Sequence, residues 1–342
     1  MDGDGVFHRF TVELYTEDGT SLGQAPLEVD WEPAREWTRF SAIRRGDLAP
    51  VEPGRVVSID PLWHEKLGPP YLEGVRLALA ANGKGEVSSD FTTAYFKDAA
   101  HRASSPFMED GKLKSGERFR YVTTAYAREP ESVETADRPR FEAEEVVPQL
   151  PLKESALSHF LATSVQLGET SGEDLAVFVP PHALAEAIEL TRGAGGKETG
   201  GILIGHLHRD ETVPEIFVEV TAQIEARHTQ ADSKSLTFTA ETWTDVRAAL
   251  DLRRKGEIML GWWHSHPVRE WCKDCPVENQ KACKLASDFF SAHDQALHRT
   301  VFPRAYSVAL VVNDVATGSP TFSGFGWRQG LLAARGFHVR KD

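Results

Sequence analysis

The stretch that decides how the second half of this chain folds is Gly261-Trp262-Trp263-His264-Ser265-His266-Pro267. It closes an apolar run, residues 257–263, with the composition of a buried strand. Residues two apart on a strand share a face, so the imidazoles of His264 and His266 are expected to point to the same side. Two histidines, one carboxylate and an open position make the zinc site of hydrolytic metalloenzymes. The stretch therefore predicts a metal centre at the end of a strand.

Three further residues can complete such a centre. Ser291 and Asp294 are three positions apart within residues 289–298, which we expect to be helical, so their side chains share a face. Asp294 is the expected third ligand, and Ser291 is an uncharged hydrogen-bond donor beside it. Glu198 stands just before the apolar, glycine-containing run 200–205, at a strand edge where a carboxylate can face a cleft and act as a base.

These residues occur in three groups along the chain: Glu198 with Gly200-x-Ile202-x-x-Gly205, then His264-Ser265-His266-Pro267, then Ser291-x-x-Asp294. In this order they resemble the JAMM motif of the MPN+ (JAB1/MPN/Mov34) zinc metallopeptidases, most of all the prokaryotic JAB branch. The resemblance covers about residues 177–330. It implies an α/β (α+β) fold, a cytidine-deaminase-like MPN domain with a mixed sheet flanked by helices.

The resemblance also implies the roles of the site residues. Zinc would be bound by His264, His266 and Asp294, with Glu198 as general acid/base and Ser291 as the group that stabilises the oxyanion. Family members mostly cleave isopeptide or peptide bonds that follow the C-terminal glycine of ubiquitin or a ubiquitin-like protein. The implied partner is therefore a ubiquitin-like protein or its conjugate, cleaved in deconjugation or in precursor processing.

Two other functions stay open. One is an amidase that processes sulfur-carrier proteins of the ubiquitin fold, which would use the same site. The other is a non-catalytic MPN scaffold that binds a partner. Scaffold members of the family lack the metal ligands, whereas this chain has all of them.

An insert separates this chain from the family pattern. His266 and Ser291 are 25 positions apart in the chain, against about seven or eight in the family. The insert, residues 268–286, contains Cys272-x-x-Cys275 and Cys283. Cysteines at this spacing predict a second, structural zinc site.

Several alternatives accompany the insert. A fourth ligand could come from His293 or His298, or the cysteines could hold an iron–sulfur cluster with a non-cysteine ligand. Three plain thiols in a loop are the alternative to any metal. Asp288 is the nearest alternative to Asp294, but no serine lies three residues before it.

The chain divides into two predicted domains. Residues 1–150 are expected to form a β-rich domain of unknown role that ends in a Glu- and Pro-rich linker, and residues 170–335 the JAB/MPN metallopeptidase domain. The β-rich part could recognise the substrate, hold another protein or mediate self-association as a homodimer. Its strand patterns are residues 10–15, 27–31, 75–81 and 119–125.

The second half alternates helices and strands. The expected helices are residues 155–167, 182–192, 240–253 and 289–298. The expected strands are residues 201–206, 215–222, 236–239, 257–263, 306–312 and 321–327. His206 and His208 are expected to be exposed rings at a strand end. Trp262 and Trp263 are expected to face opposite sides of their strand, one in the core and one toward the cleft. Residues 225–235 are expected to form a solvated loop.

Composition excludes several classes of function. The formal net charge is −13 and the pI about 5.5, which disfavours a nucleic-acid partner. The apolar runs are too short for a transmembrane segment, and the N-terminus has no apolar signal region. Three clustered cysteines make a poor disulfide framework. We therefore expect a cytoplasmic protein without a membrane partner.

Overall fold

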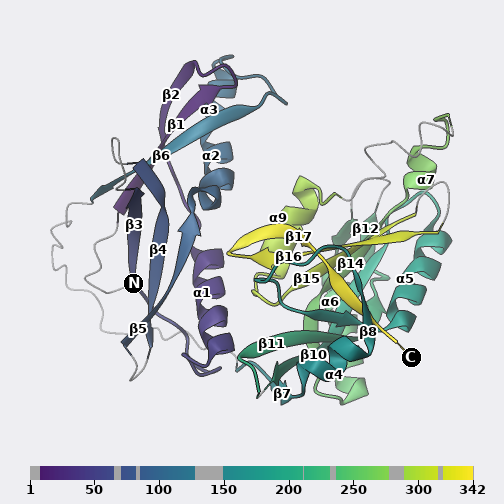
Figure 1. The fold of residues 1–342 in the computed structure, drawn as a ribbon. Helices are drawn as coiled ribbons and strands as arrows, with labels where there is room; N and C mark the ends of the chain where they lie inside the picture. Colours follow the sequence, from purple (N-terminus) through teal and green to yellow (C-terminus); the bar gives the residue numbers. More distant parts are fainter. Residues whose placement is uncertain are drawn as a thin grey trace, which may run out of the picture. The chain divides into compact units, whose positions relative to one another are not determined.

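The computed structural model describes residues 8–64, 71–81, 85–127, 149–210, 212–231, 236–276, 289–314 and 319–341. The chain folds as two compact units, Met1–Gln149 and Leu150–Asp342, which are taken in turn below (Figure 1). Among the described helices, none combines the length and the apolar character needed to span a membrane.

The first unit is built on two antiparallel sheets of three strands, in the orders β2-β1-β6 and β3-β4-β5. Its strands are β1 (His8–Thr16), β2 (Ser21–Pro26), β3 (Val56–His64), β4 (Tyr71–Ala81), β5 (Gly85–Thr92) and β6 (Phe119–Ala127). Its helices are α1 (Glu32–Arg45), η1 (Thr93–Phe96), α2 (Lys97–Ala103) and α3 (Ser105–Glu109). The prediction of a β-rich N-terminal part is confirmed.

Helix α1 was not predicted from the sequence. It packs along β4 and β5 (Figure 1) and ends at Gly46, which adopts the left-handed conformation that closes helices. Glu36 and Arg39 are almost fully buried on it, and Arg39 donates to backbone carbonyls of the following loop. The prediction of a strand at residues 27–31 is wrong, because these residues lead from β2 into the helix.

The second unit contains a mixed ten-stranded sheet. The strand order is β17-β16-β15-β14-β10-β11-β9-β18-β8, and β7 pairs with β10 beside this path. These strands are β7 (Leu152–Glu154), β8 (Ser164–Leu167), β9 (Val177–Val179), β10 (Gly200–Asp210), β11 (Glu215–Glu225), β14 (Ile258–His266), β15 (Val308–Asn313), β16 (Thr321–Arg328), β17 (Leu331–Arg335) and β18 (Phe337–Arg340). A separate hairpin joins β12 (Thr229–Ala231) to β13 (Leu236–Phe238).

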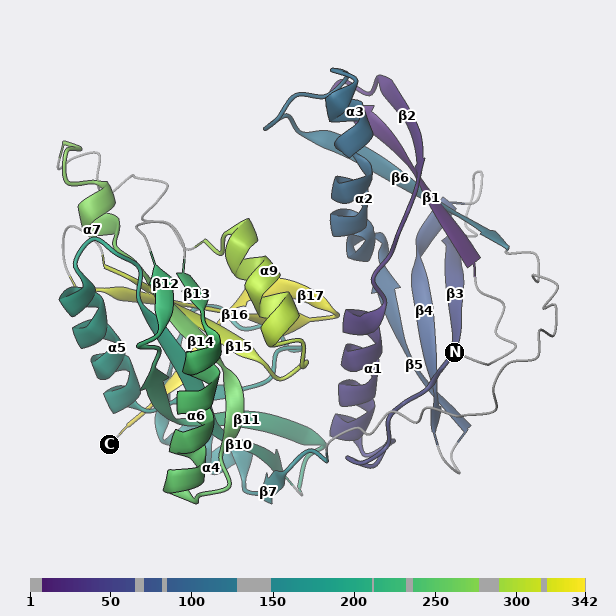
Figure 2. The ribbon, with the colours of Figure 1, turned by 180° about the vertical axis from the view of Figure 1, so that it is seen from behind.

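Helices cover both faces of this sheet. The helices are α4 (Leu157–Ala162), α5 (Pro181–Ala194), α6 (Ala240–Arg253), α7 (Val268–Trp271) and α9 (Ala292–Val301). On one face, α5 packs against β10, β11 and β15 (Figure 1). On the other face, α6 and α9 cover a core around Trp262, Ile202 and Phe302 (Figure 2). The predicted mixed sheet flanked by helices is confirmed.

The sheet extends beyond the residues assigned to the metallopeptidase domain. Strands β7 and β8, before residue 170, and β18, after residue 335, are hydrogen-bonded into it. The predicted helix at residues 155–167 is shorter than expected and gives way to β8. Residues 128–148 of the predicted linker lie outside the described residues. The boundaries 1–150 and 170–335 themselves stay a prediction.

Two expectations about side chains are wrong. His206 and His208 are buried, because partners on other segments satisfy their nitrogens: Lys153 approaches His206 at 2.8 Å, and Glu219 approaches His208 at 3.0 Å. Trp262 and Trp263 do face opposite sides of β14, but both are core residues, 0% and 1% exposed. Neither tryptophan lines a cleft.

Strand β14 lies very close to its parallel neighbour at Gly261. This glycine has φ of 156°, and a Cβ at its position would lie 1.8 Å from the carbonyl oxygen of Val308. Only a residue without a side chain fits this approach. The glycine therefore permits β14 and β15 to pair in the register that runs on to His264 and His266.

We predict that Gly261→Ala destabilises the protein by about 3 kcal/mol, the upper range for forcing an atom into a packed interior. The backbone of Val308 has to move to relieve the clash, which breaks the pairing of β14 with β15. Urea denaturation of wild type and variant measures the effect.

Gly193→Ala is the matched control. A Cβ at Gly193, near the end of α5, meets no atom within 4 Å. Alanine there should leave the stability unchanged or raise it by up to about 1 kcal/mol, since it favours the helix. Equal effects of the two substitutions would contradict the close approach at Gly261.

Candidate metal centre

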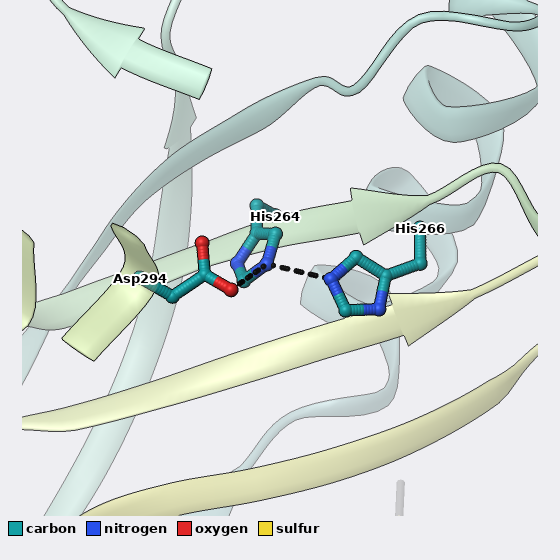
Figure 3. Close-up of side chains that lie close together, drawn as sticks. All are labelled: His264, His266 and Asp294. Atoms are coloured by element: carbon teal, nitrogen blue, oxygen red, sulfur yellow. Dashed lines mark hydrogen bonds and ion pairs between the residues drawn. The ribbon is translucent and has the colours of Figure 1, made fainter. Parts of the chain in front are cut away.

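Strand β14 brings the two predicted histidines together. His264 and His266 are 0% and 1% exposed, and their Nε2 atoms are 3.1 Å apart. The strand is held on both sides, with His264 opposite Gly200 of β10 and opposite Val311 of β15. Figure 3 shows both rings on one face of the strand. The period-two expectation for this pair is met.

Asp294 reaches the histidines from the first turn of α9. The helix begins with a capping box: the Ser291 hydroxyl accepts from the Asp294 backbone N–H at 3.1 Å, and the Asp294 carboxylate accepts from the Ser291 N–H at 2.8 Å. The same carboxylate oxygen, Oδ2, lies 3.5 Å from Nε2 of His264 (Figure 3). The helix cap thus fixes a buried carboxylate against the histidine pair.

The three side chains lie close enough together to share one metal ion. Ligand atoms of all three lie within 4.8 Å of one another. Bonds of 2.0–2.1 Å in a tetrahedral zinc site place ligand atoms about 3.3 Å apart, and two of the three pairs come close to this, His264 with His266 at 3.1 Å and His264 with Asp294 at 3.5 Å. Within the described residues, this is the cluster of histidine and carboxylate groups able to hold a metal ion.

The surroundings set the charge of these groups as a metal site needs it. Burial and, to a smaller extent, the neighbouring His264 together lower the pKa of His266 to about 3. Burial raises the pKa of Asp294, but His264 and the hydrogen bonds from Ser291 outweigh that effect and bring the pKa to about 2. At neutral pH the site therefore contains a neutral imidazole at His266 and an ionised carboxylate, the forms that bind metal ions.

Glu198 stands two positions before β10, on the segment that leads into this strand. Contact with β14 continues past Gly200, because Ser265 N–H donates to the Thr199 carbonyl at 2.8 Å and Thr199 N–H donates to the Ser265 hydroxyl at 3.0 Å. Antiparallel pairing extended by one more residue would bring Glu198 opposite His266. Glu198 is 5% exposed.

Ser291 is placed to donate a hydrogen bond. Its oxygen accepts from the Asp294 N–H as the N-cap of α9, which leaves the hydroxyl hydrogen for another acceptor. The residue lies three positions before the carboxylate that contacts His264, so its hydroxyl belongs to the same end of the helix. The helix-cap function of Ser291 was not predicted from the sequence.

The cysteine insert is described only in part. After α7, Cys272 is buried and Cys275 is exposed, while Cys283 and the alternative carboxylate Asp288 lie outside the described residues. Of the two histidines considered as a fourth ligand, His293 is exposed. His298 is buried and accepts a hydrogen bond from Trp262. The second metal stays a prediction.

The polar segment after β11 is more ordered than expected. Residues 229–231 form β12 and pair with β13, whereas Arg227 and His228 are exposed, as a solvated loop predicts. Leu236 of β13 is buried, and a Cβ at Gly200 would lie 2.6 Å from its side chain. The hairpin therefore packs directly on the strand residue opposite His264.

Sequence reasoning missed the side chains that surround the ligands. His264 stacks on Trp262 and His266 on Phe289, and Asn313 is the neighbour of His266 on β15. Trp262 stands two positions before His264, a spacing that predicts a shared face. Phe289 and Asn313 are distant in the chain, and no local pattern connects them with the histidines.

The fold and the cluster together define an α/β domain with a candidate mononuclear metal centre at its central strands. Residues 174–286 match the family model described as "JAB1/Mov34/MPN/PAD-1 ubiquitin protease", and this part of the chain is a JAB/MPN domain. The matched region includes Glu198, His264 and His266 and ends before Ser291 and Asp294.

No curated protein matches the chain. The solution structure of protein DSY2949 from Desulfitobacterium hafniense is similar to it with 18% sequence identity and a TM-score of 0.34, over 48% of this chain and 94% of that chain.

We predict that the metal-free protein loses stability as the pH falls from 6.5 to about 4.5. His266 and His298 stay neutral in the folded state down to a pKa of about 3, whereas the unfolded chain binds their protons near 6.5. Each such group contributes a slope of up to about 1.4 kcal/mol per pH unit. His266→Gln removes one group and should flatten the dependence, as measured by urea denaturation across this range after chelator treatment.

The control for this series is His293→Gln, at an exposed position on the same helix as Asp294. It should leave the slope as in wild type. A slope that His266→Gln does not change would show that the buried imidazole is not the source of the pH dependence.

Proposed function

We propose that this protein is a zinc-dependent isopeptidase or peptidase that cleaves after the C-terminal glycine of a ubiquitin-like protein. The observation that carries the proposal is the buried set of His264, His266 and Asp294, spaced for one zinc ion within a JAB/MPN domain. Deconjugation and precursor processing are both covered by this reaction, because each breaks an amide bond at the same glycine.

His264, His266 and Asp294 would hold the zinc through two imidazole nitrogens and one carboxylate oxygen. When bound, zinc supplies Lewis-acid chemistry, which polarises the scissile carbonyl and makes a nearby water easier to deprotonate. The ligands contribute rigidity, because all three are buried and two of them stand on a strand that is paired along both edges. A site held in this way needs little rearrangement on binding.

Glu198 and Ser291 would move and stabilise charge in the reaction. Glu198 is buried and precedes the strand that pairs with the histidine strand, which supports its assignment as the carboxylate that would take a proton from the attacking water and deliver it to the leaving amine. The Ser291 hydroxyl, with its oxygen engaged by the Asp294 N–H, can donate its hydrogen to the oxyanion.

A purely structural role for the cluster is less favourable. His264 and His266 each bury an Nδ1 atom that has no hydrogen-bond partner within the described residues. Burying two imidazoles with incomplete hydrogen bonding beside an ionised carboxylate costs stability, which is typical of groups retained for a function. A scaffold that only binds a partner would gain nothing from retaining them, so this arrangement favours catalysis over the non-catalytic MPN function.

We predict that Glu198→Gln retains zinc but lowers turnover by about 10²- to 10⁴-fold, because it removes the proton-transferring carboxylate and leaves the ligands in place. Zinc content is measured on the purified protein by elemental analysis. Turnover is measured on a fusion in which a ubiquitin-like protein precedes a reporter, and in parallel on a sulfur-carrier protein fusion.

His264→Ala is the counterpart and should lose both zinc and activity. Cys272→Ala, in the insert, should keep the zinc of the His264 site, and any additional zinc lost in it would support a second site. Wild-type protein that binds no zinc would rule out the metallopeptidase. Zinc-loaded protein that cleaves only the sulfur-carrier fusion would favour the amidase.

A further inference from the structure

The two ligand histidines lack the contact that usually orients such residues. Metal-binding histidines generally donate their second ring nitrogen to a carboxylate, a carbonyl or water, which fixes the ring. Here Nδ1 of His264 and Nδ1 of His266 are both buried, and neither has a hydrogen-bond partner within the described residues. Within the described residues, packing is therefore what supports the rings on the side away from their Nε2 atoms.

Each ring is stacked on an aromatic side chain. His264 lies on Trp262 with ring centroids 4.6 Å apart and an interplanar angle of 15°. His266 lies on Phe289 with centroids 4.3 Å apart and an angle of 20°. A near-parallel aromatic neighbour resists rotation of each imidazole about its Cβ–Cγ bond, because that rotation would swing the ring out of its plane and into the stacked side chain.

Trp262 is itself fixed. Its indole N–H donates to Nδ1 of His298 at 3.1 Å, and its ring is fully buried against Phe238 and the core beneath α6 and α9. The face that supports His264 is thus part of the rigid centre of the second unit. Its position does not depend on the insert.

The support of His266 comes from side chains on either side of residues 277–288. Trp271, at the end of α7, and Phe289, just before α9, both contact the His266 ring, and their own centroids are 6.4 Å apart. α7 is fastened to the end of β15, because Arg269 N–H donates to the Asp314 carbonyl at 2.8 Å. Trp271, inside the insert, and Phe289, after it, therefore meet at one metal ligand.

Asn313 does not replace this support. It is the partner of His266 in the parallel ladder between β14 and β15. Its amide N–H₂ donates to Ser323, and its amide oxygen is buried without a hydrogen bond within the described residues. Asn313 is close enough to His266 that hydrogen bonding to it raises the pKa of that imidazole, but the two side chains do not reach the geometry of a regular hydrogen bond that would hold the ring.

We infer that Trp262 and Phe289 are positioning residues that take the place of outer hydrogen bonds and aim the Nε2 atoms of His264 and His266 at the metal. The inference rests on the proposed zinc site. It assigns a task to the segment between the insert and α9: its Phe289 supplies the aromatic face that orients the second histidine. Metal affinity and coordination geometry should then depend on the ring at position 289, although Phe289 provides no ligand.

The test measures metal binding of the full chain without any substrate. Phe289→Leu keeps an apolar side chain but removes the flat face, and should weaken zinc binding about 10-fold or more, the usual effect of losing an outer contact to a ligand. Zinc affinity is measured by competition with a chromogenic chelator. Cobalt substitution reports on geometry, and the visible absorption bands should shift in the variant.

Two further variants separate orientation from packing. Phe289→Tyr retains the ring and should restore wild-type affinity and spectrum. Phe178→Leu makes the same substitution at a fully buried position that stacks on His338, in the cluster beneath α4. It should lower the melting temperature of the metal-free protein and leave zinc affinity unchanged.

The outcomes distinguish this inference from the proposed function. Wild type that binds neither zinc nor cobalt overturns the proposed function and this inference with it. If the wild-type protein binds zinc and Phe289→Leu has the same zinc affinity and the same cobalt spectrum, the inference is overturned and the proposed function is not. Phe289→Tyr that is as weak as Phe289→Leu also overturns it, because a structural role of the native side chain would then suffice.

Discussion

The second unit depends on one strand that is hydrogen-bonded along both edges. β14 pairs with β10 on one side and with β15 on the other, and the glycine at position 261 permits the close approach to β15. Central, doubly paired strands are the segments least able to open locally. The histidines at the end of this strand are therefore presented by backbone that is held on both sides, and Asp294 is brought to them by α9.

Residue spacing within single elements predicted the candidate metal ligands, whereas contacts between residues distant in the chain determined which side chains surround them. The two-residue spacing of His264 and His266 and the three-residue spacing of Ser291 and Asp294 express strand and helix geometry, so they could be interpreted from sequence alone. The places of Phe289 and Asn313 could not be predicted in this way. Phe289 approaches His266 where the chain returns before α9, and Asn313 is its neighbour through the parallel pairing of β14 with β15. Such contacts leave no periodic signal in the chain.

Helix α1 and the burial of His206 and His208 were not predicted from the sequence, and the two failures have the same physical cause. In α1, buried Glu36, Thr38 and Arg39 interrupt the apolar stripe by which a helix is recognised, although Pro33 and Gly46 mark its ends. His206 and His208 appeared exposed because they are polar, yet partners on β7 and β11 satisfy them. Burial of polar groups depends on partners that are remote in sequence, so hydropathy alone assigns them to the surface.

The capping box of α9 explains how the chain accommodates a long insert beside its metal ligands. Asp294 is held by the first turn of its own helix, which follows the insert, and by His264, which stands on β14 before the insert. The path from His266 to Ser291 therefore does not set where the carboxylate lies. The length of this connection can therefore change without moving the carboxylate, provided that an aromatic ring still returns to His266 just before α9.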